Sequence, residues 1–260
     1  MSKQNKIIAI ANQKGGVGKT TTTINLAVGL SRLKKSVLLI DLDPQGNATM
    51  GCGINSREIE PNACDMLLGD ENINKVIMRA ENAGIDIIGS NTDLTAAELQ
   101  IIGHDNSESI LKKRLATIEK QYDYILIDCP PSLNILTVNA LVAANGVLIP
   151  MQCEYYALEG LASLLETIDR VKSTANPALE IEGIVRTMFD GRNNLANDVS
   201  AQLVEYFDSK LYVTVIPRNV RVAEAPSHGM SVIEYDKSSR GAIAYLGLAG
   251  EVIRGNNHGS

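Results

Sequence analysis

The chain has 260 residues, of which 45% are hydrophobic and 21% charged, so it is long enough for one large α/β domain with a substantial core. Its net charge of −6 and pI near 5.2 argue against a surface that attracts polyanions as a whole, but leave local basic patches open. Its four cysteines, Cys52, Cys64, Cys129 and Cys153, have no C-x-x-C spacing and fit a reducing cytosol better than a disulfide framework.

Targeting and membrane-spanning segments are not evident in the sequence. The polar start MSKQNK leads into an apolar run too short for a signal peptide, and no stretch approaches the ~18–20 apolar residues of a membrane span. We expect a cytoplasmic protein with a single domain over residues 1–254 and a disordered tail over residues 255–260.

Apolar runs typical of buried strands alternate with helical patterns along the chain. Strands are expected at Ile7–Ala11, Ser36–Asp43, Ile85–Ser90, Tyr122–Pro131, Gly146–Met151, Ile181–Phe189 and Leu211–Pro217. Helices are expected at Thr20–Leu33, Ser107–Lys120, Asn134–Ala144, Leu158–Ser173, Asn197–Phe207 and, weakened by two glycines, Arg240–Arg254. The alternation predicts an α/β fold, with a mostly parallel twisted sheet and helices on both faces. Such sheets bind ligands beyond the carboxyl ends of their strands.

A glycine-rich loop joins the first expected strand to the first helix, within the stretch ANQKGGVGKTTTTIN. It follows the phosphate-loop pattern G-x-x-x-x-G-K-[ST] at Gly18, Lys19 and Thr20. The first glycine of the pattern is replaced by Gln13, and a second lysine, Lys14, comes directly after it. The loop therefore predicts a phosphate site with two unusual positions.

The residue types in this loop suit a nucleotide triphosphate. The glycines let backbone N–H groups turn toward phosphate oxygens, and the following helix adds the positive end of its dipole. Lys19 can pair with the β- and γ-phosphates, the Thr20 hydroxyl can ligate Mg²⁺, and Thr21 can bond a further phosphate oxygen. A glycine-rich turn without a ligand is the alternative. The candidate binding residues of the loop are Lys14, Gly15, Gly16, Val17, Gly18, Lys19, Thr20 and Thr21.

Acidic residues follow two other expected strands. Asp128 ends the run YILID, at the place of a Walker B carboxylate that holds Mg²⁺ through water; capping of the next helix is the alternative. Asp41 and Asp43 lie two residues apart, so one can approach the water shell of the metal while the other orients the attacking water. A turn at Asp43-Pro44 is the alternative there. The candidate metal groups are Thr20, Asp43 and Asp128.

Lys14 has a different expected orientation from Lys19. Its Cα must splay away from the phosphate cradle, so its side chain is expected to point out of its own site. If another copy of the chain faces the loop, Lys14 can reach the phosphates bound by that copy. This geometry suits a nucleotide-sandwich dimer.

Several motifs resemble those of the ParA/MinD superfamily of P-loop ATPases. KGGVGKT is similar to their deviant Walker A motif, and DLDPQGNAT and DCPPS are similar to their switch I and Walker B/switch II segments. ALEG and IPRNVRVAEAPSHG resemble the Soj-type chromosomal ParA proteins in particular. The resemblance extends from about Lys6 to Ile253, and the combination of these blocks in this order is highly specific.

The resemblance implies an ATPase of chromosome or plasmid segregation, with ATP and Mg²⁺ as cofactors. ATP binding would close a homodimer in which Lys14 reaches the nucleotide of the partner, and Gly15 lies where close approach leaves little room for a side chain. The implied catalytic residues are Lys14, Lys19 and Asp43, and Asp43 is needed for slow hydrolysis that a ParB-type partner stimulates. Two more positions match those that line the adenine: Pro217 and Asn219.

The family also binds double-stranded DNA without sequence preference, which implies a nucleoid-associated protein. Lys210, Arg218 and Arg221 occur within residues 209–222 without an acid, and Arg192 follows an expected strand. Taken singly, each arginine is more often a solvated surface residue. The resemblance places Arg192 and Arg221 on the DNA-binding face, and few phosphate contacts per chain imply weak, salt-sensitive binding.

Other functions stay open beside this one. A MinD-like membrane ATPase needs a basic amphipathic C-terminal helix, but that region offers only Arg240 and Arg254, so no membrane partner is expected. A metal-cluster carrier is disfavoured by the missing C-x-x-C, and a small-molecule ligase or kinase by the lack of an acceptor motif. A sequence-specific DNA-binding regulator is disfavoured because we expect no helix-turn-helix before the loop.

Overall fold

A seven-stranded sheet forms the centre of the computed structural model, which describes residues 5–69 and 71–255. The strands are β1 (Lys6–Ile10), β2 (Val37–Asp41), β3 (Met78–Ala80), β4 (Ile85–Ile88), β5 (Tyr124–Asp128), β6 (Gly146–Gln152) and β7 (Glu180–Thr187). Their order is β3-β4-β2-β5-β1-β6-β7, and neighbouring strands are parallel except for β3 and β4. The predicted α/β fold with a mostly parallel sheet is confirmed. Of the tail expected at residues 255–260, residues 256–260 lie outside the described residues.

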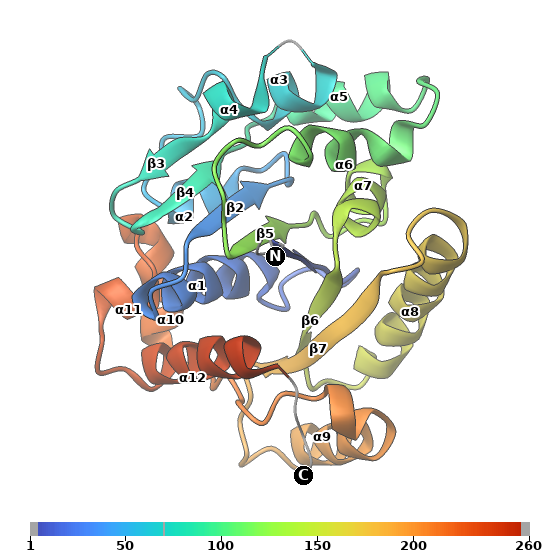
Figure 1. Cartoon of the computed structure of the whole chain (residues 1–260). Helices are drawn as coiled ribbons and strands as arrows, with labels where there is room; N and C mark the ends of the chain where they lie inside the picture. Colours follow the sequence, from blue (N-terminus) through green and yellow to red (C-terminus); the bar gives the residue numbers. More distant parts are fainter. Residues whose placement is uncertain (1–4, 70, 256–260) are drawn as a thin grey trace.

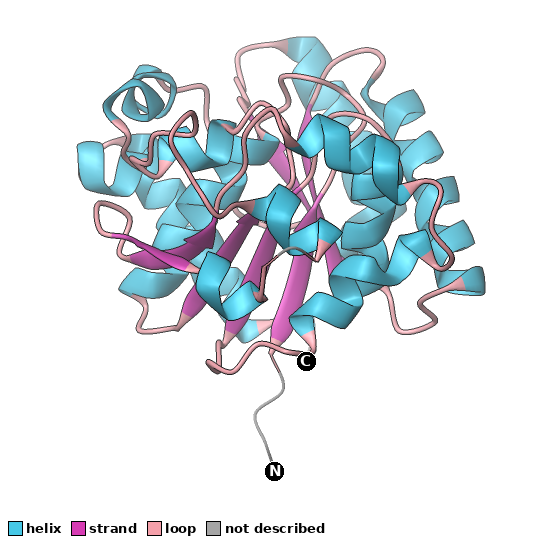
Figure 2. Ribbon diagram, turned by 90° about the horizontal axis from the view of Figure 1, so that it is seen from above, coloured by secondary structure: helices cyan, strands magenta, loops and turns pink. Residues whose placement is uncertain are grey.

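Helices cover both faces of this sheet, as Figures 1 and 2 show. The α-helices are α1 (Lys19–Arg32), α2 (Asn47–Gly51), α3 (Ala63–Leu68), α4 (Ile73–Val76), α5 (Leu94–Ile101), α6 (Ile110–Leu115), α7 (Ile135–Ala143), α8 (Ala157–Thr174), α9 (Asn194–Phe207), α10 (Val220–Glu224), α11 (Val232–Tyr235) and α12 (Arg240–Arg254). Short 3₁₀ helices are η1 (Ser107–Ser109), η2 (Asp208–Lys210) and η3 (Ala225–His228). In the described part of the chain, no helix combines the length and apolar character needed to cross a membrane.

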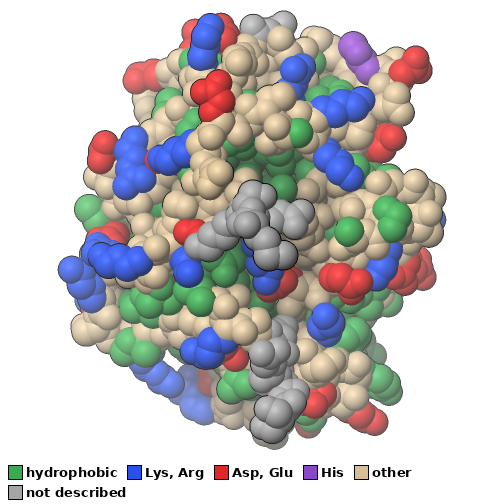
Figure 3. All heavy atoms as spheres, in the orientation of Figure 1, with side chains coloured by type: hydrophobic (Ala, Val, Ile, Leu, Met, Phe, Trp, Pro, Cys, Tyr) green, Lys and Arg blue, Asp and Glu red, His purple; other side chains and the backbone are tan. Residues whose placement is uncertain are grey.

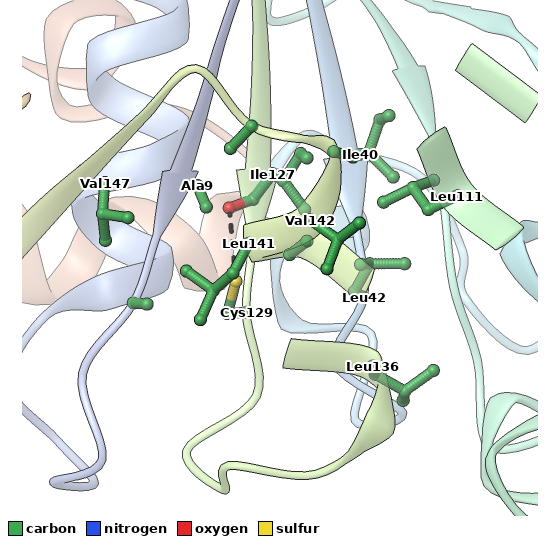
Figure 4. Packing of buried hydrophobic residues seen from close by; sticks show 14 of the residues in the cluster. Ala9, Ile40, Leu42, Leu111, Ile127, Cys129, Leu136, Leu141, Val142 and Val147 are labelled. Carbon is green, nitrogen blue, oxygen red and sulfur yellow. Dashed lines mark hydrogen bonds between the residues drawn. The ribbon is translucent and has the colours of Figure 1, made fainter. Parts of the chain in front are cut away.

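The sheet separates two apolar cores because successive side chains of a strand point to opposite faces. Ile8 and Ile10 of β1 pack with α1, α11 and α12, whereas Ala9 packs on the other face with α3 and α5 to α9. Figure 4 shows part of this second core, where Ile127 and Val147 come from strands and Leu141 from α7. Burial on both faces is the reason that the central strands read as continuous apolar runs.

The strand expected at Leu211–Pro217 is not formed. This segment lies beside β7 without forming a ladder. Leu211 forms an isolated bridge with Ile184 of β7, Pro217 forms one with Phe189 just after β7, and the N–H of Ile216 donates to the Arg186 carbonyl. Between them, the N–H groups of Val213 and Thr214 donate to the carboxylate of Glu251 rather than to a strand. A side chain of α12 therefore takes the donors that a continuous strand would use.

The helix expected at Ser107–Lys120 is shorter and ends at Leu115. The hydroxyl of Thr117 donates to the Arg114 carbonyl at 2.8 Å, and Asn74 binds the backbone of both Thr117 and Glu119. These side-chain bonds replace helical ones beyond Leu115. In contrast, α12 is continuous through its glycines, and Gly247 permits close approach of Thr214, whose hydroxyl would lie 3.2 Å from an added Cβ.

Candidate functional site

A cavity of about 730 Å³ opens at the carboxyl end of the sheet. The segments after β1, β2, β5 and β7 contribute to its wall, together with α5, α10 and α12. Predicted site residues that line it are Gly15, Gly16, Gly18, Lys19, Thr20, Thr21, Asp43, Pro217, Arg218 and Asn219. The carboxyl-end rule for parallel sheets therefore places most of the predicted nucleotide residues in one cavity.

The glycine-rich loop forms a cradle of backbone donors. Gly16 and Gly18 have φ angles of 74° and 85°, which side chains rarely adopt, so glycine is required at both positions. Gly18 is the N-cap of α1, and its carbonyl accepts the first helical bond from Thr22 N–H at 2.8 Å. The N–H groups of the first helical turn therefore have no intrahelical partners and lie at the cavity. A helix end of this kind favours a bound anion.

Lys19 supplies a buried cation to the same cavity, with 7% of its surface exposed. Its Nζ donates to the Lys14 carbonyl at 3.1 Å. Burial lowers the pKa of Lys19, while the nearby Asp128 carboxylate opposes that shift. Within the described residues Lys19 forms no ion pair, so its ammonium is available to an anion in the cavity.

Asp128 lies behind Thr20, fully buried, and does not itself line the cavity. The hydroxyls of Thr20 and Thr23 donate to its two carboxylate oxygens, each at 2.8 Å. Burial, and next the charge of Asp41, raise the pKa of Asp128 to about 8. The described residues contain no group of three or more His, Cys, Asp and Glu side chains placed to hold a metal. One hydroxyl and one carboxylate nevertheless fit Mg²⁺, which takes few protein ligands and fills its shell with phosphate and water.

Asp41 and Asp43 have different surroundings, although the sequence pairs them. The Asp41 carboxylate is fully buried and accepts hydrogen bonds from the N–H and hydroxyl of Thr49, at 2.9 and 2.8 Å. Asp43 lines the cavity, its Oδ1 accepts from Gln45 N–H, and its carbonyl accepts from the Ser90 hydroxyl at 2.6 Å. Asp41 therefore anchors α2, while Asp43 is the carboxylate that a ligand can meet.

Lys14 and Val17 lie outside the cavity wall. The Lys14 ammonium forms an ion pair with Glu154 at 2.5 Å, so the predicted outward direction of its side chain agrees with the structure. Val17 is buried, and its carbonyl accepts a hydrogen bond from Thr187 at 2.7 Å. A Cβ added to Gly15 would meet nothing within 4 Å, so this side of the loop is open in the single chain.

The cavity wall also contains residues that sequence reasoning missed. Thr187 ends β7, Met188 follows it, and Tyr245 comes from α12. The rule that ligands bind at the carboxyl ends of parallel strands could have indicated Thr187 and Met188. Nothing in the sequence marks Tyr245, a buried tyrosine within a helix, as a site residue. Asn219 is the N-cap of α10, with its Oδ1 accepting from Val222 N–H at 3.2 Å. Its amide N–H groups form no hydrogen bond with the part of the chain that the structure describes, so they are left for a ligand.

The arginines expected at DNA do not form one isolated basic patch. Arg192 is 91% exposed and pairs with Asp190 at 2.7 Å, which holds the pKa of Asp190 below its usual range. Arg221 pairs with Glu224 at 2.9 Å and Asp236 at 3.5 Å. Arg218 lies instead at the cavity wall. Basic and acidic side chains are also interspersed on the face seen in Figure 3.

The parallel sheet, the glycine cradle at α1 and the buried Asp128 define a P-loop nucleotide-binding protein. The AAA domain family (AAA_31) matches residues 5–181. The chain is 51% identical over 247 residues to the sporulation initiation inhibitor protein Soj of Bacillus subtilis, covering 95% of this chain and 98% of that protein. It is 48% identical over 249 residues to the chromosome partitioning protein ParA of Myxococcus xanthus, covering 96% and 88%. The chain therefore belongs to the family of AAA domain ATPases that includes the ParA and Soj chromosome-partitioning proteins.

A solved structure shares this fold over nearly the whole chain. It is described as cobyrinic acid a,c-diamide synthase from Mycobacterium smegmatis with bound ADP and magnesium. The TM-score is 0.85 at 34% identity, and the match covers 96% of this chain and 95% of that one.

Proposed function

We propose that this protein is an ATP-dependent DNA-partitioning ATPase. ATP binding drives a homodimer that binds double-stranded DNA without sequence preference, and hydrolysis stimulated by a ParB-type partner releases it. The observation that carries the proposal is the division of the two loop lysines. Lys19 lies in the cavity, whereas the side chain of Lys14 points out of it and pairs with Glu154; in this proposal Lys14 serves a second copy once that copy binds. The name of the relative at 48% identity, chromosome partitioning protein ParA, supports this role.

In this proposal the cavity holds ATP with its phosphates in the cradle. Lys19 and the N–H groups of the first turn of α1 offset the phosphate charge. Thr20 and Asp128 would hold Mg²⁺, which would supply positive charge against the phosphates. Asp43 orients the attacking water, and the products are ADP and inorganic phosphate. Pro217 and Asn219 contact the base.

The main alternative is a MinD-like ATPase that binds membranes through its C-terminal helix. In the structure the apolar face of α12, including Tyr245 and Leu248, is buried in the core beside α1. Of the large apolar side chains on the described part of α12, Ile243 is the one that is mostly exposed, at 61%, which is less apolar surface than a lipid-binding helix face needs.

Co-sedimentation tests the two functions directly. The protein is centrifuged with plasmid DNA or with vesicles of anionic phospholipid, each with Mg²⁺ and either ATP or ADP. We expect retention on DNA with ATP and release with ADP. Retention on vesicles without retention on DNA would overturn the proposal in favour of the membrane function.

A further inference from the structure

Glu154 is the partner of Lys14, although the sequence motifs assign it no chemistry. Its Oε2 lies 2.5 Å from Lys14 Nζ. Glu154 follows β6, and a turn fixes its backbone: its N–H donates to the Gln152 carbonyl at 2.9 Å, and its carbonyl accepts from Ala157 N–H at 3.0 Å. Because β6 is paired with β1, this turn and the phosphate loop follow neighbouring strand ends. The carboxylate is thus held beside the loop.

The backbone of Lys14 is fixed as well. Its N–H donates to Asn12 Oδ1 at 3.0 Å, and the buried Asn12 amide donates to the Pro150 carbonyl at 2.8 Å. Its carbonyl accepts from Lys19 on the cavity side. A change of partner for the Lys14 ammonium therefore needs rotation of its side chain and no movement of the loop.

The ion pair between Lys14 and Glu154 is weak enough for a phosphate to replace the carboxylate. The side chains of Lys14 and Glu154 are 37% and 45% exposed, so solvent screens their attraction. Exposed pairs of this kind change an equilibrium by about 1.4- to 5-fold. A phosphate in a desolvated interface is a stronger partner for an ammonium than a solvated carboxylate. The pair can therefore delay transfer of Lys14 to a phosphate, but it cannot prevent it.

We infer that Glu154 is a positioning residue for Lys14. It holds the ammonium against its own chain until a second copy presents a nucleotide, and so raises the ATP concentration at which the dimer forms. The neighbouring Tyr155 and Tyr156 are 74% and 68% exposed and form a T-shaped pair, so the surface beside the ion pair is open to a second copy. This inference rests on the proposed function.

The test is the substitution Glu154→Gln, which keeps the size of the side chain and removes its charge. Dimer formation is followed by analytical ultracentrifugation while ATP is titrated with Mg²⁺ at fixed protein concentration. We expect half-maximal dimer at about 2- to 5-fold lower ATP, and an unchanged ATP affinity of the dilute monomer. Glu159→Gln, at an exposed position in the first turn of α8, is the matched control and leaves the threshold unchanged.

Two further arms separate this inference from the proposed function. The difference between Glu154→Gln and wild type shrinks at high salt, because screening weakens the same pair. Lys14→Ala binds ATP and stays monomeric. If the wild type also stays monomeric at saturating ATP, the proposed function is wrong. If the wild type dimerises while Glu154→Gln needs the same or more ATP, or differs equally at all salt concentrations, the inference about Glu154 is wrong and the proposed function stands.

Discussion

The nucleotide cavity and the arginine surface differ in how their charges are held. At the cavity, Lys19 is buried in the wall and Asp128 is buried behind it, and both are bonded to uncharged groups of the loop and of α1. On the surface, Arg192 and Arg221 are exposed and paired with acids from their surroundings. A ligand of the cavity therefore meets Lys19, which has no ion pair within the described residues, whereas DNA must replace existing ion pairs. Substitution of a buried unpaired charge is therefore expected to change binding or hydrolysis strongly, and substitution of an exposed paired charge is expected to change it weakly.

The largest expected effect is on hydrolysis. We expect Asp43→Ala to lower phosphate release by about 100- to 10,000-fold, the usual range for a group that positions or activates the nucleophile. It should still form the ATP dimer and remain on DNA. Asp43→Asn is the control, because it keeps an oxygen to accept from Gln45 N–H and removes only the charge. If Asp43→Ala stays monomeric at saturating ATP and Mg²⁺, our assignment of Asp43 to hydrolysis is wrong.

Removal of the buried cation should next affect binding itself. We expect Lys19→Ala to weaken ATP binding by about 30-fold to more than 1,000-fold, because it leaves phosphate charge unpaired in a desolvated site. Isothermal titration calorimetry with ATP and Mg²⁺ measures this change. Lys237→Ala, at an exposed lysine in the turn before α12, is the control with unchanged affinity. Near-normal ATP affinity in Lys19→Ala would contradict the site.

A smaller effect is expected at the arginine surface. Arg221→Glu should weaken DNA binding about tenfold and leave ATP-dependent dimerisation unchanged, since each dimer loses two phosphate contacts at exposed positions. Fluorescence anisotropy with labelled duplex DNA at two salt concentrations measures the affinity and its salt slope. Arg170→Glu changes the net charge equally on α8, across the sheet from α10. If both variants behave alike, Arg221 is not part of a DNA site.

The smallest expected effect is a pH dependence of stability in the nucleotide-free protein. Burial raises the pKa of Asp41 to about 6 and that of Asp128 to about 8. The native state then binds protons that the unfolded chain has released, so the contribution of these two groups to stability is full below about pH 4 and is lost as the pH rises toward 8. One such proton changes the free energy of unfolding by about 1.4 kcal/mol per pH unit, which corresponds to a few degrees in Tm.

Thermal unfolding in EDTA at pH 6, 7 and 8 measures this slope. Asp128→Asn should flatten it, whereas Asp105→Asn, at an exposed loop position, should leave it unchanged. A Tm that rises from pH 6 to pH 8 in the wild type would show that the buried carboxyls do not carry these protons.

Much of the fold and of the cavity could be predicted, because both depend on local patterns. The run before Asp128 is a buried strand, and the glycines with positive φ identify the loop. The expected strand at Leu211–Pro217 failed because Glu251, more than thirty residues away, takes its donors. The stretch at residues 209–222 contains no acid in its sequence, but the surface around it does contain acids, because Asp236 lies beside Arg221 in space. A distant residue again decides the surroundings.

The sequence by itself determined the α/β class, the phosphate cradle and the presence of Lys19, Thr20 and Asp128 around it. Strand–loop–helix order and left-handed glycines are properties of neighbouring residues, so a linear pattern contains them. Only the tertiary structure decided the partners: Thr49 for Asp41, Glu154 for Lys14, and Asp190 and Glu224 for the arginines. Side-chain charges interact through space, and their strength depends on burial and distance that the folded chain alone sets.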